Sequence, residues 1–178
     1  MIDDGEPNQQ IGRGPFTQMT DVSVLFVCTG NICRSPTAEG VLRHKLEQQG
    51  LGERVGVESS GLGDWHVGDP PDPRAIARAS LRGYDLSPLR ARQFKIEDYH
   101  NFELILAMDR GHMAAMERNR PGAARARLHL FLDFAPETIL SREVPDPYYG
   151  GLTDYDHALD LIEPGVDGLI AALKRTYL

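Results

Sequence analysis

One stretch, Val22 to Gly40, constrains the fold more than any other part of the 178-residue chain. It opens with a mainly apolar, β-branched and aromatic run, Val22 to Val27, which has the length and composition of a strand buried on both faces. The run ends at Cys28, and a glycine and an asparagine follow closely. Both residue types tolerate the left-handed backbone angles of a tight loop. The stretch therefore predicts a buried strand that leads into a sharply curled loop.

A helix is expected directly after this loop. Ser35-Pro36 has the character of a helix start, with a hydroxyl near the N-cap and a proline in the first turn. A curled loop ahead of a helix directs several backbone N–H groups to one point, which creates an anion site. The loop begins with the thiol of Cys28 and ends with Arg34. A guanidinium can hold two phosphate oxygens while a thiolate attacks the phosphorus, so the loop predicts phosphoryl transfer.

The rest of the chain alternates between strand-like and helix-like patterns. The expected strands are residues 22–27, 55–59, 102–108 and 128–132, and the expected helices are residues 36–49, 73–81, 110–118 and 154–176. Pro164-Gly165 should kink or break the last helix. Strands separated by helices indicate an α/β fold with a parallel sheet covered by helices. Residues 1–21 are polar and rich in glycine and proline, so we expect a disordered tail followed by a single domain over residues 22–178.

Composition limits the class of protein. The net charge is −7, from 19 basic and 26 acidic residues, so no general affinity for nucleic acid is expected. The two cysteines, Cys28 and Cys33, lie in the same loop and cannot form a framework of structural disulfides, which fits a reducing compartment. Neither a signal peptide nor a membrane span is found in the sequence. We therefore expect a cytoplasmic protein that does not bind membranes; export without a signal peptide stays open as an alternative.

Four motifs together resemble the low-molecular-weight protein tyrosine phosphatase family. They are VCTGNICRSP, GDWHVGDPPDPR, ARQ and DPYYGG, in the family's order and at similar distances, from about Val22 to the C-terminus. Bacterial members, and in particular the actinobacterial type, are especially similar. The resemblance implies a four-stranded parallel sheet in the order 2-1-3-4, with helices on both faces and a phosphate-binding loop after strand 1. It also implies hydrolysis of phosphotyrosine in proteins by a monomer without a metal or cofactor, with inorganic phosphate as product and a tyrosine kinase as one conceivable substrate.

The resemblance assigns roles to the loop residues. Cys28 is the nucleophile that forms a phosphocysteine intermediate, and Arg34 clamps the phosphate. The hydroxyl of Ser35 steadies the thiolate, and Asn31 keeps the loop in its strained shape. Ser59 supports Asn31, although the neighbouring Ser60 leaves that choice open. Backbone N–H groups that bind the phosphoryl oxygens come from Thr29, Gly30, Asn31, Ile32, Cys33, Arg34 and Ser35.

The motif DPYYGG supplies the proton donor that a phenolate leaving group requires. Asp146 matches the family's general acid, and once ionised it can take a proton from the water that cleaves the phosphocysteine. On composition alone DPYYGG is only a turn. Asp69 and Asp72 are rival carboxylates, but DPPDPR is more typical of a helix entry.

The expected walls of the pocket are aromatic and apolar. Trp65, Tyr148 and Tyr149 can offer faces to a phosphotyrosyl ring, although Tyr149 in particular could instead pack its loop onto the body. Phosphoarginine phosphatases of this fold have threonine where this chain has Ile32, so the isoleucine favours tyrosine. His66 lies in a polar loop without metal-ligand spacing, and we expect no role for it.

Two observations leave questions open. Leu89 lies at or near a position where many family members have a histidine, so that histidine's contribution must be absent or replaced. Cys33 lies close in sequence to Cys28, and we hypothesise that peroxide drives a reversible Cys28–Cys33 disulfide.

Two other functional classes fit the sequence less well. An arsenate reductase of this fold would need further cysteines outside the loop, and the chain has none. A phosphoprotein-binding module with an inactive pocket is disfavoured, because Cys28, Arg34 and Asp146 are all present.

Overall fold

The structure, a computed structural model, describes residues 20–178. The predicted tail lies outside the described residues except for Thr20 and Asp21; Asp21 pairs with Arg54 at 2.6 Å. In chain order the elements are β1 (Val22–Cys28), α1 (Arg34–Gln48), β2 (Val55–Gly61), α2 (Pro73–Leu81), α3 (Asp98–Asn101), β3 (Leu104–Ala107), α4 (Arg110–Asn119), β4 (Arg127–Leu130), the 3₁₀ helix η1 (Phe131–Phe134) and α5 (Leu152–Thr176).

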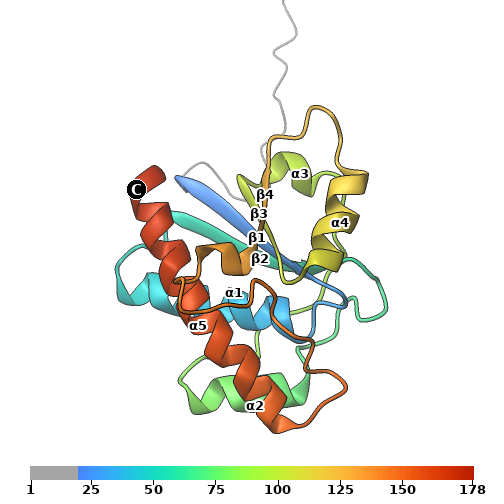
Figure 1. The fold of residues 1–178 in the computed structure, drawn as a ribbon, viewed down its shortest axis with the longest axis vertical. Helices are drawn as coiled ribbons and strands as arrows, with labels where there is room; N and C mark the ends of the chain where they lie inside the picture. The colour runs from blue at the N-terminus through green and yellow to red at the C-terminus, as the bar shows by residue number, and fades with distance from the viewer. Residues whose placement is uncertain (1–19) are drawn as a thin grey trace, which may run out of the picture.

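The four strands form one parallel sheet in the order β2-β1-β3-β4, which confirms the predicted topology. Strand β1 lies in the interior of the sheet between β2 and β3 (Figure 1). Its seven residues are all buried, as expected of a strand covered on both faces. The carboxyl end of β1 therefore opens at the edge of the sheet where α/β folds place their ligands.

Alternation along β1 divides the hydrophobic core into two parts. Val24, Phe26 and Cys28 belong to the larger cluster, which includes buried residues of α1 and α5. Leu25 and Val27 face the opposite cluster, which contains Tyr99 and Phe102. In Figure 1, α1, α2 and α5 lie on one side of the sheet, and α3 and α4 lie on the other. This arrangement confirms the prediction of helices on both faces.

The last helix is not broken at Pro164, so of the kink or break expected from the sequence the break does not occur. Helix α5 continues from Leu152 to Thr176 with the proline inside it. An interior proline costs roughly 3 kcal/mol, but apolar residues on both sides of it are buried in the core, and this burial outweighs the lost hydrogen bond. Gly165 permits close packing instead of a break, because a Cβ there would lie 2.7 Å from the ring of Phe131.

The other differences concern element boundaries. Helix α1 begins at Arg34 and not at Pro36, and α5 begins two residues before Asp154. The predicted fourth strand is shorter than expected because its last two residues, 131–132, belong to η1. Residues 98–101, expected to be part of a connection, form the short helix α3. Local hydrogen bonding at element ends decides these boundaries, and periodicity does not report on it.

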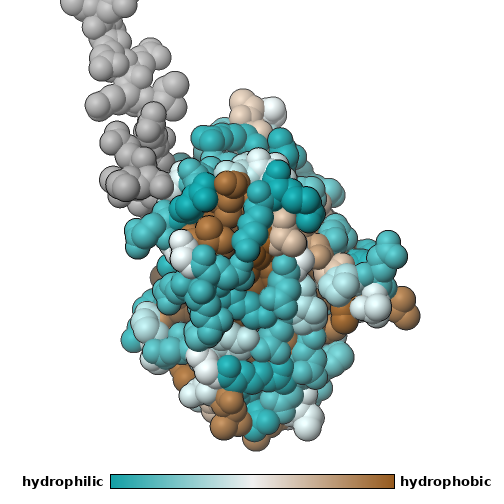
Figure 2. Space-filling model, turned by 90° about the vertical axis from the view of Figure 1, so that its left-hand side faces the viewer, coloured by the Kyte–Doolittle hydropathy of each residue, from teal (hydrophilic) through white to brown (hydrophobic). Residues whose placement is uncertain are grey.

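Hydrophilic residues dominate the face shown in Figure 2, and hydrophobic residues appear there as separate areas. None of the helices in residues 20–178 combines the length and hydropathy that a membrane span requires.

Candidate active site

The loop between β1 and α1 forms the floor of a pocket of about 310 Å³. Asn31 within this loop has a φ of 58°, the left-handed conformation that the sequence predicted for a tight curl. The residues that line the pocket are Cys28, Thr29, Gly30, Ile32, Cys33, Arg34, Trp65, His66, Asp146, Tyr148 and Tyr149. The pocket thus brings together residues from the first strand and from the loop before the last helix.

The sulfur of Cys28 has a hydroxyl beside it. The Oγ of Ser35, which is fully buried, lies 2.9 Å from the Cys28 Sγ. Ser35 is not the N-cap of α1: the cap position is Cys33, and it makes no side-chain capping hydrogen bond. Because Ser35 lies inside the first helical turn, its hydroxyl faces the sulfur, and there it could stabilise a thiolate by donating a hydrogen bond.

A chain of hydrogen bonds supports this loop from β2 and α1. The amide of Asn31 donates to Ser35 Oγ at 2.9 Å and to Ser59 Oγ at 2.8 Å. Ser59 in turn donates to Glu39 at 2.6 Å. Burial raises the pKa of Glu39 above its ordinary value. Of the two serines considered from the sequence, the structure brings Ser59 to Asn31. The backbone carbonyl of Ser60 lies 3.3 Å from Ser35 Oγ and can accept its single hydroxyl hydrogen only when that hydrogen does not point to the sulfur of Cys28.

The histidine that many family members have near position 89 is replaced here by Leu89. Leu89 is a partly buried apolar residue that packs against the core. The carbonyl of the Asn31 side chain instead accepts a 2.9 Å hydrogen bond from the backbone N–H of Arg92. Both ends of the Asn31 amide are therefore bound without a histidine.

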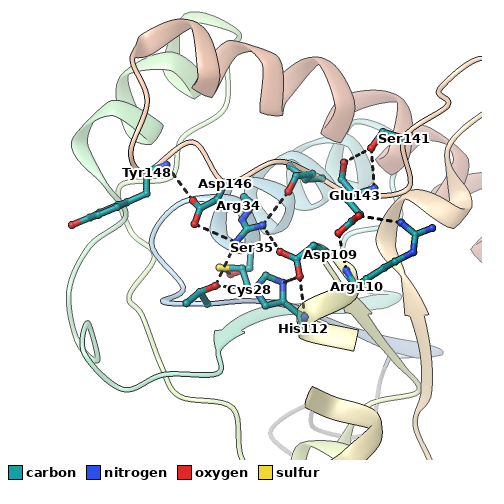
Figure 3. A network of polar contacts seen from close by, with 12 residues as sticks. Cys28, Arg34, Ser35, Asp109, Arg110, His112, Ser141, Glu143, Asp146 and Tyr148 are labelled. Carbon is teal, nitrogen blue, oxygen red and sulfur yellow. Dashed lines mark hydrogen bonds and ion pairs between the residues drawn. The ribbon is translucent and has the colours of Figure 1, made fainter. Parts of the chain in front are cut away.

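Arg34 is buried beneath the pocket, with only 4% of its side chain exposed. Its Nη1 donates to Asp109 Oδ2 at 2.8 Å and to the backbone carbonyl of Val144 at 3.0 Å. Its Nη2 lies 3.5 Å from Asp146 Oδ2 (Figure 3). These partners fix the plane of the guanidinium, so its donors are oriented before an anion arrives.

Asp146 lies in the loop before α5, and 40% of its side chain is exposed. Its Oδ1 accepts from the backbone N–H of Tyr148 at 3.1 Å, while Oδ2 faces Arg34. Arg74 of α2 holds the same loop by donating to the carbonyls of Tyr148 at 3.1 Å and Gly150 at 3.2 Å. The loop is therefore anchored directly after its exposed aspartate.

The walls of the pocket are largely aromatic. Trp65 and Tyr149 are 71% and 91% exposed, and the rings of Tyr148 and Tyr149 meet edge to face at 5.0 Å. His66, for which no role was expected, also lines the pocket, and its Nδ1 lies 3.2 Å from Asp69.

The rival carboxylates lie outside the lining of the pocket. Asp69 pairs with His66, and Asp72 caps α2 by accepting from the backbone N–H of Arg74 at 2.8 Å. DPPDPR is thus a helix entry, as the sequence indicated. Among residues 20–178, no three His, Cys, Asp or Glu side chains are grouped so that they could hold a metal ion.

The second cysteine of the loop lies in a different environment. Cys28 and Cys33 are both buried free thiols. The Sγ of Cys33 lies 3.4 Å from the hydroxyl of Tyr155, and burial raises the pKa of Cys33 to about 12. Cys33 is therefore a neutral thiol near pH 7, and the proposed disulfide with Cys28 stays a prediction.

Sequence reasoning missed Asp109 and His112 beside Arg34. Asp109 accepts from Arg34 and caps α4 by accepting from the backbone N–H of His112 at 2.9 Å. A signal was available, because Asp109 follows the clearest buried run of the sequence by one residue. Polar residues just after a parallel strand gather at the edge of the sheet where ligands bind.

Comparisons with known proteins agree on one family. The family described as low molecular weight phosphotyrosine protein phosphatase matches residues 23–177. A low molecular weight protein-tyrosine-phosphatase of Streptomyces coelicolor is 41% identical over 154 residues, which are 85% of this chain and 93% of that protein. A protein tyrosine phosphatase from Entamoeba histolytica, solved with Hepes in the active site, aligns with a TM-score of 0.82 at 34% identity, over 86% of this chain and 97% of that one. The Drosophila arginine phosphatase aligns with a TM-score of 0.78 at 26% identity, over 85% of this chain and 97% of that one.

Proposed function

The chain belongs to the low molecular weight phosphotyrosine protein phosphatase family, a family of hydrolases, and we propose that it hydrolyses phosphotyrosine through a phosphocysteine on Cys28. One observation carries the proposal. Cys28, Arg34 and Asp146 line the same pocket, and Arg34 lies 3.5 Å from Asp146. A nucleophile, a fixed cation and a carboxyl group are the three parts that metal-independent phosphoryl transfer from an aryl phosphate requires.

In the first step the Cys28 thiolate attacks phosphorus, and an S–P bond forms as the bond to the phenolic oxygen breaks. The hydroxyl of Ser35, 2.9 Å from the sulfur, stabilises the thiolate beforehand. Asp146, in its protonated form, donates its proton to the leaving oxygen. Arg34 and the backbone N–H groups of the loop bind the phosphoryl oxygens, with most effect in the transition state.

In the second step water attacks the phosphorus of the phosphocysteine. Asp146, now ionised, takes a proton from that water, the S–P bond breaks, and inorganic phosphate leaves. The exposure of Asp146 supports this role because water can reach its carboxylate. The same residue thus acts first as acid and then as base.

The walls favour an aromatic substrate. Trp65 and Tyr148 can flank a phenyl ring, and Ile32 contributes an apolar side chain to the pocket. The Drosophila arginine phosphatase has the same fold, so phosphoarginine is the second candidate substrate. Replacing Ile32 with threonine should move the preference toward phosphoarginine if this position selects the substrate.

Partners and location follow from this proposal. The substrates are phosphotyrosyl proteins, among which a tyrosine kinase is one candidate, and the enzyme acts as a monomer in the cytoplasm. An arsenate reductase is disfavoured because the chain has only two cysteines, both in the loop.

The test is turnover of aryl phosphates in EDTA by the wild type, Cys28→Ser and Asp146→Asn. We expect Cys28→Ser to abolish activity and Asp146→Asn to lower kcat by roughly 10²- to 10⁴-fold. The loss in Asp146→Asn should shrink as the phenol becomes a better leaving group, since such a group needs less protonation. Asp69→Asn, a change at the rival carboxylate, is the matched control and should retain activity. Turnover by Cys28→Ser, or a loss in Asp146→Asn that is equal for all phenols, would contradict the mechanism.

A further inference from the structure

His112 is a buried side chain that the proposed mechanism does not use. It lies in the first turn of α4 and is 5% exposed. Its Nε2 lies 2.9 Å from the hydroxyl of Thr29, in the loop that forms the floor of the pocket. Its Nδ1 lies 3.1 Å from Asp109 Oδ1, without the alignment of a hydrogen bond.

Both neighbours of His112 also contact Arg34. The Nη2 of Arg34 donates to Thr29 Oγ1 at 3.4 Å, and its Nη1 donates to Asp109 Oδ2 at 2.8 Å. Arg34, Thr29, His112 and Asp109 therefore form a closed ring of side-chain contacts. Figure 3 shows Arg34, Asp109 and His112 of this ring close to Cys28. Three segments contribute to it: the loop after β1, the start of α1 and the start of α4.

The protons of this ring can be assigned from the donors available. A guanidinium can only donate, so the Thr29 oxygen accepts from Arg34. Nδ1 of His112 lies 3.1 Å from a carboxylate oxygen of Asp109, which can only accept, so the proton of the neutral imidazole is placed on Nδ1. Nε2 then carries the lone pair and accepts the hydroxyl hydrogen of Thr29. Burial lowers the pKa of His112 to about 4, so the neutral form persists near pH 7.

We propose that His112 is a positioning residue for phosphoryl transfer, acting through Thr29 and Asp109 to hold the guanidinium of Arg34 in the plane that receives the phosphoryl oxygens. The proposal rests on the proposed function, because it assigns Arg34 to the transferring group. Without the His112 side chain, the Thr29 hydroxyl can rotate away, and Asp109 Oδ1 loses the imidazole beside it and keeps only the backbone N–H of residue 112. The guanidinium of Arg34 then has fewer constraints on its orientation. Its two N–H donors are less well aligned with the phosphoryl oxygens in the transition state.

Three substitutions separate this role from simple packing. His112→Phe keeps a planar ring and removes both nitrogens. Thr29→Val keeps the shape of threonine and removes the hydroxyl. His112→Gln is the conservative variant, because its amide can reach the Thr29 hydroxyl from the same helical turn.

We expect His112→Phe and Thr29→Val each to lower kcat for an aryl phosphate by about 10- to 100-fold, with a smaller change in KM. Because both changes break the same link, the double variant should be little worse than the more severe single variant. His112→Gln should recover most of kcat. Rates are expressed per folded active site, from the burst of phenol released by the first turnover, and thermal melting verifies that each variant is folded.

The proposal would be overturned by an unchanged kcat per active site in Thr29→Val. It would also be overturned if the kcat of His112→Gln did not exceed that of His112→Phe, or if the losses of kcat in the two single variants were fully additive in the double variant. If His112→Phe does not fold, Thr29→Val and His112→Gln still decide the matter: Thr29→Val must lower kcat, and His112→Gln must not. A wild type that turns over no aryl phosphate would instead count against the proposed function, so the two failures can be told apart.

Discussion

The side-chain amide of Asn31 donates a 2.8 Å hydrogen bond to the hydroxyl of Ser59, which joins the loop after β1 to strand β2. The same amide reaches Ser35, whose hydroxyl lies beside the sulfur of Cys28. The position of the nucleophile therefore depends on contacts with a neighbouring strand as well as on the loop itself. Several predictions about the loop and its supports can be made from such contacts.

Asn31→Ala should lower both activity and stability. The substitution removes hydrogen bonds to Ser35, Ser59 and the backbone of Arg92, and it places alanine at a φ of 58°. We expect at least a ten-fold loss of kcat/KM. Asn31→Gly removes the same hydrogen bonds but tolerates the backbone angle, so it should be more stable than Asn31→Ala by about 1 kcal/mol in urea unfolding. Equal free energies of unfolding for Asn31→Gly and Asn31→Ala would contradict this expectation, because the positive φ would then not destabilise alanine at this position.

Gly61→Ala should damage the loop from outside it. A Cβ at Gly61, the last residue of β2, would lie 2.9 Å from the backbone nitrogen of Asn31 and from the carbonyl carbon of Gly30. Backbone atoms cannot rotate away as a side chain can, so the loop must shift, and we expect kcat to fall by more than about ten-fold. Gly122→Ala, where a Cβ would have no neighbour within 4 Å, is the control for the substitution itself. A Gly61→Ala enzyme as fast as the control would refute this account.

Arg74→Ala should release the loop that bears Asp146. Arg74 donates to two carbonyls of that loop, and its guanidinium lies 4.8 Å from the ring centre of Tyr155. In a looser loop the carboxyl group of Asp146 is less often in position to protonate the leaving oxygen, so kcat should fall while KM changes less. The fall in kcat should be largest for phenols that are poor leaving groups. Steady-state kinetics over a series of phenols measures this. Arg78→Ala, on the same helix but paired with Asp156 of α5, should not show the dependence on leaving group.

His112 should make the protein less stable in acid. Its pKa in the folded state is about 4, lowered from 6.5 by burial, with Asp109, Arg34, Asp146 and Glu143 as its charged neighbours. Between pH 6.5 and 4 the unfolded chain binds a proton at this position that the folded chain does not, so stability falls as the pH falls. The loss amounts to about 3 kcal/mol over this window.

Urea unfolding of the wild type and of His112→Gln at pH 7 and pH 4 measures the difference. The variant lacks the group that titrates, so its stability should fall by about 3 kcal/mol less than that of the wild type. His157→Gln, a change at an exposed histidine, is the control and should follow the wild type. Parallel pH profiles of the wild type and His112→Gln would contradict the expectation.

The sheet could be predicted from the sequence because its strands are short, apolar and separated by helical patterns. The run Val22 to Val27 lies in the interior of the sheet and is buried on both faces, and both properties follow from its composition. The sequence left open a break at Pro164, because local rules weigh the lost hydrogen bond but not the tertiary burial on either side of it. The helix α3 was missed because four residues are too few to show a period.

The residues of the candidate site could be predicted where they belong to a sequence motif. They were missed where their importance depends on tertiary contacts between distant segments. The loop residues and Asp146 were singled out from motifs, and the structure brings them to one pocket. Asp109 and His112 were missed because their significance lies in contacts with Arg34 and Thr29, far away in the chain. His66 was set aside because its loop lacks metal-ligand spacing, and the sequence of a loop does not show that the side chain lines the pocket.

The pocket draws its sulfur from the first strand and its carboxyl group from the loop ahead of the final helix. During synthesis the oxyanion cradle can form early, but it has no proton donor until α5 has emerged and packed against α1. Phosphatase turnover is therefore a reporter of completed folding, and in chains whose C-terminal helix is undocked it should fall at least as far as in Asp146→Asn, even while the cradle is intact.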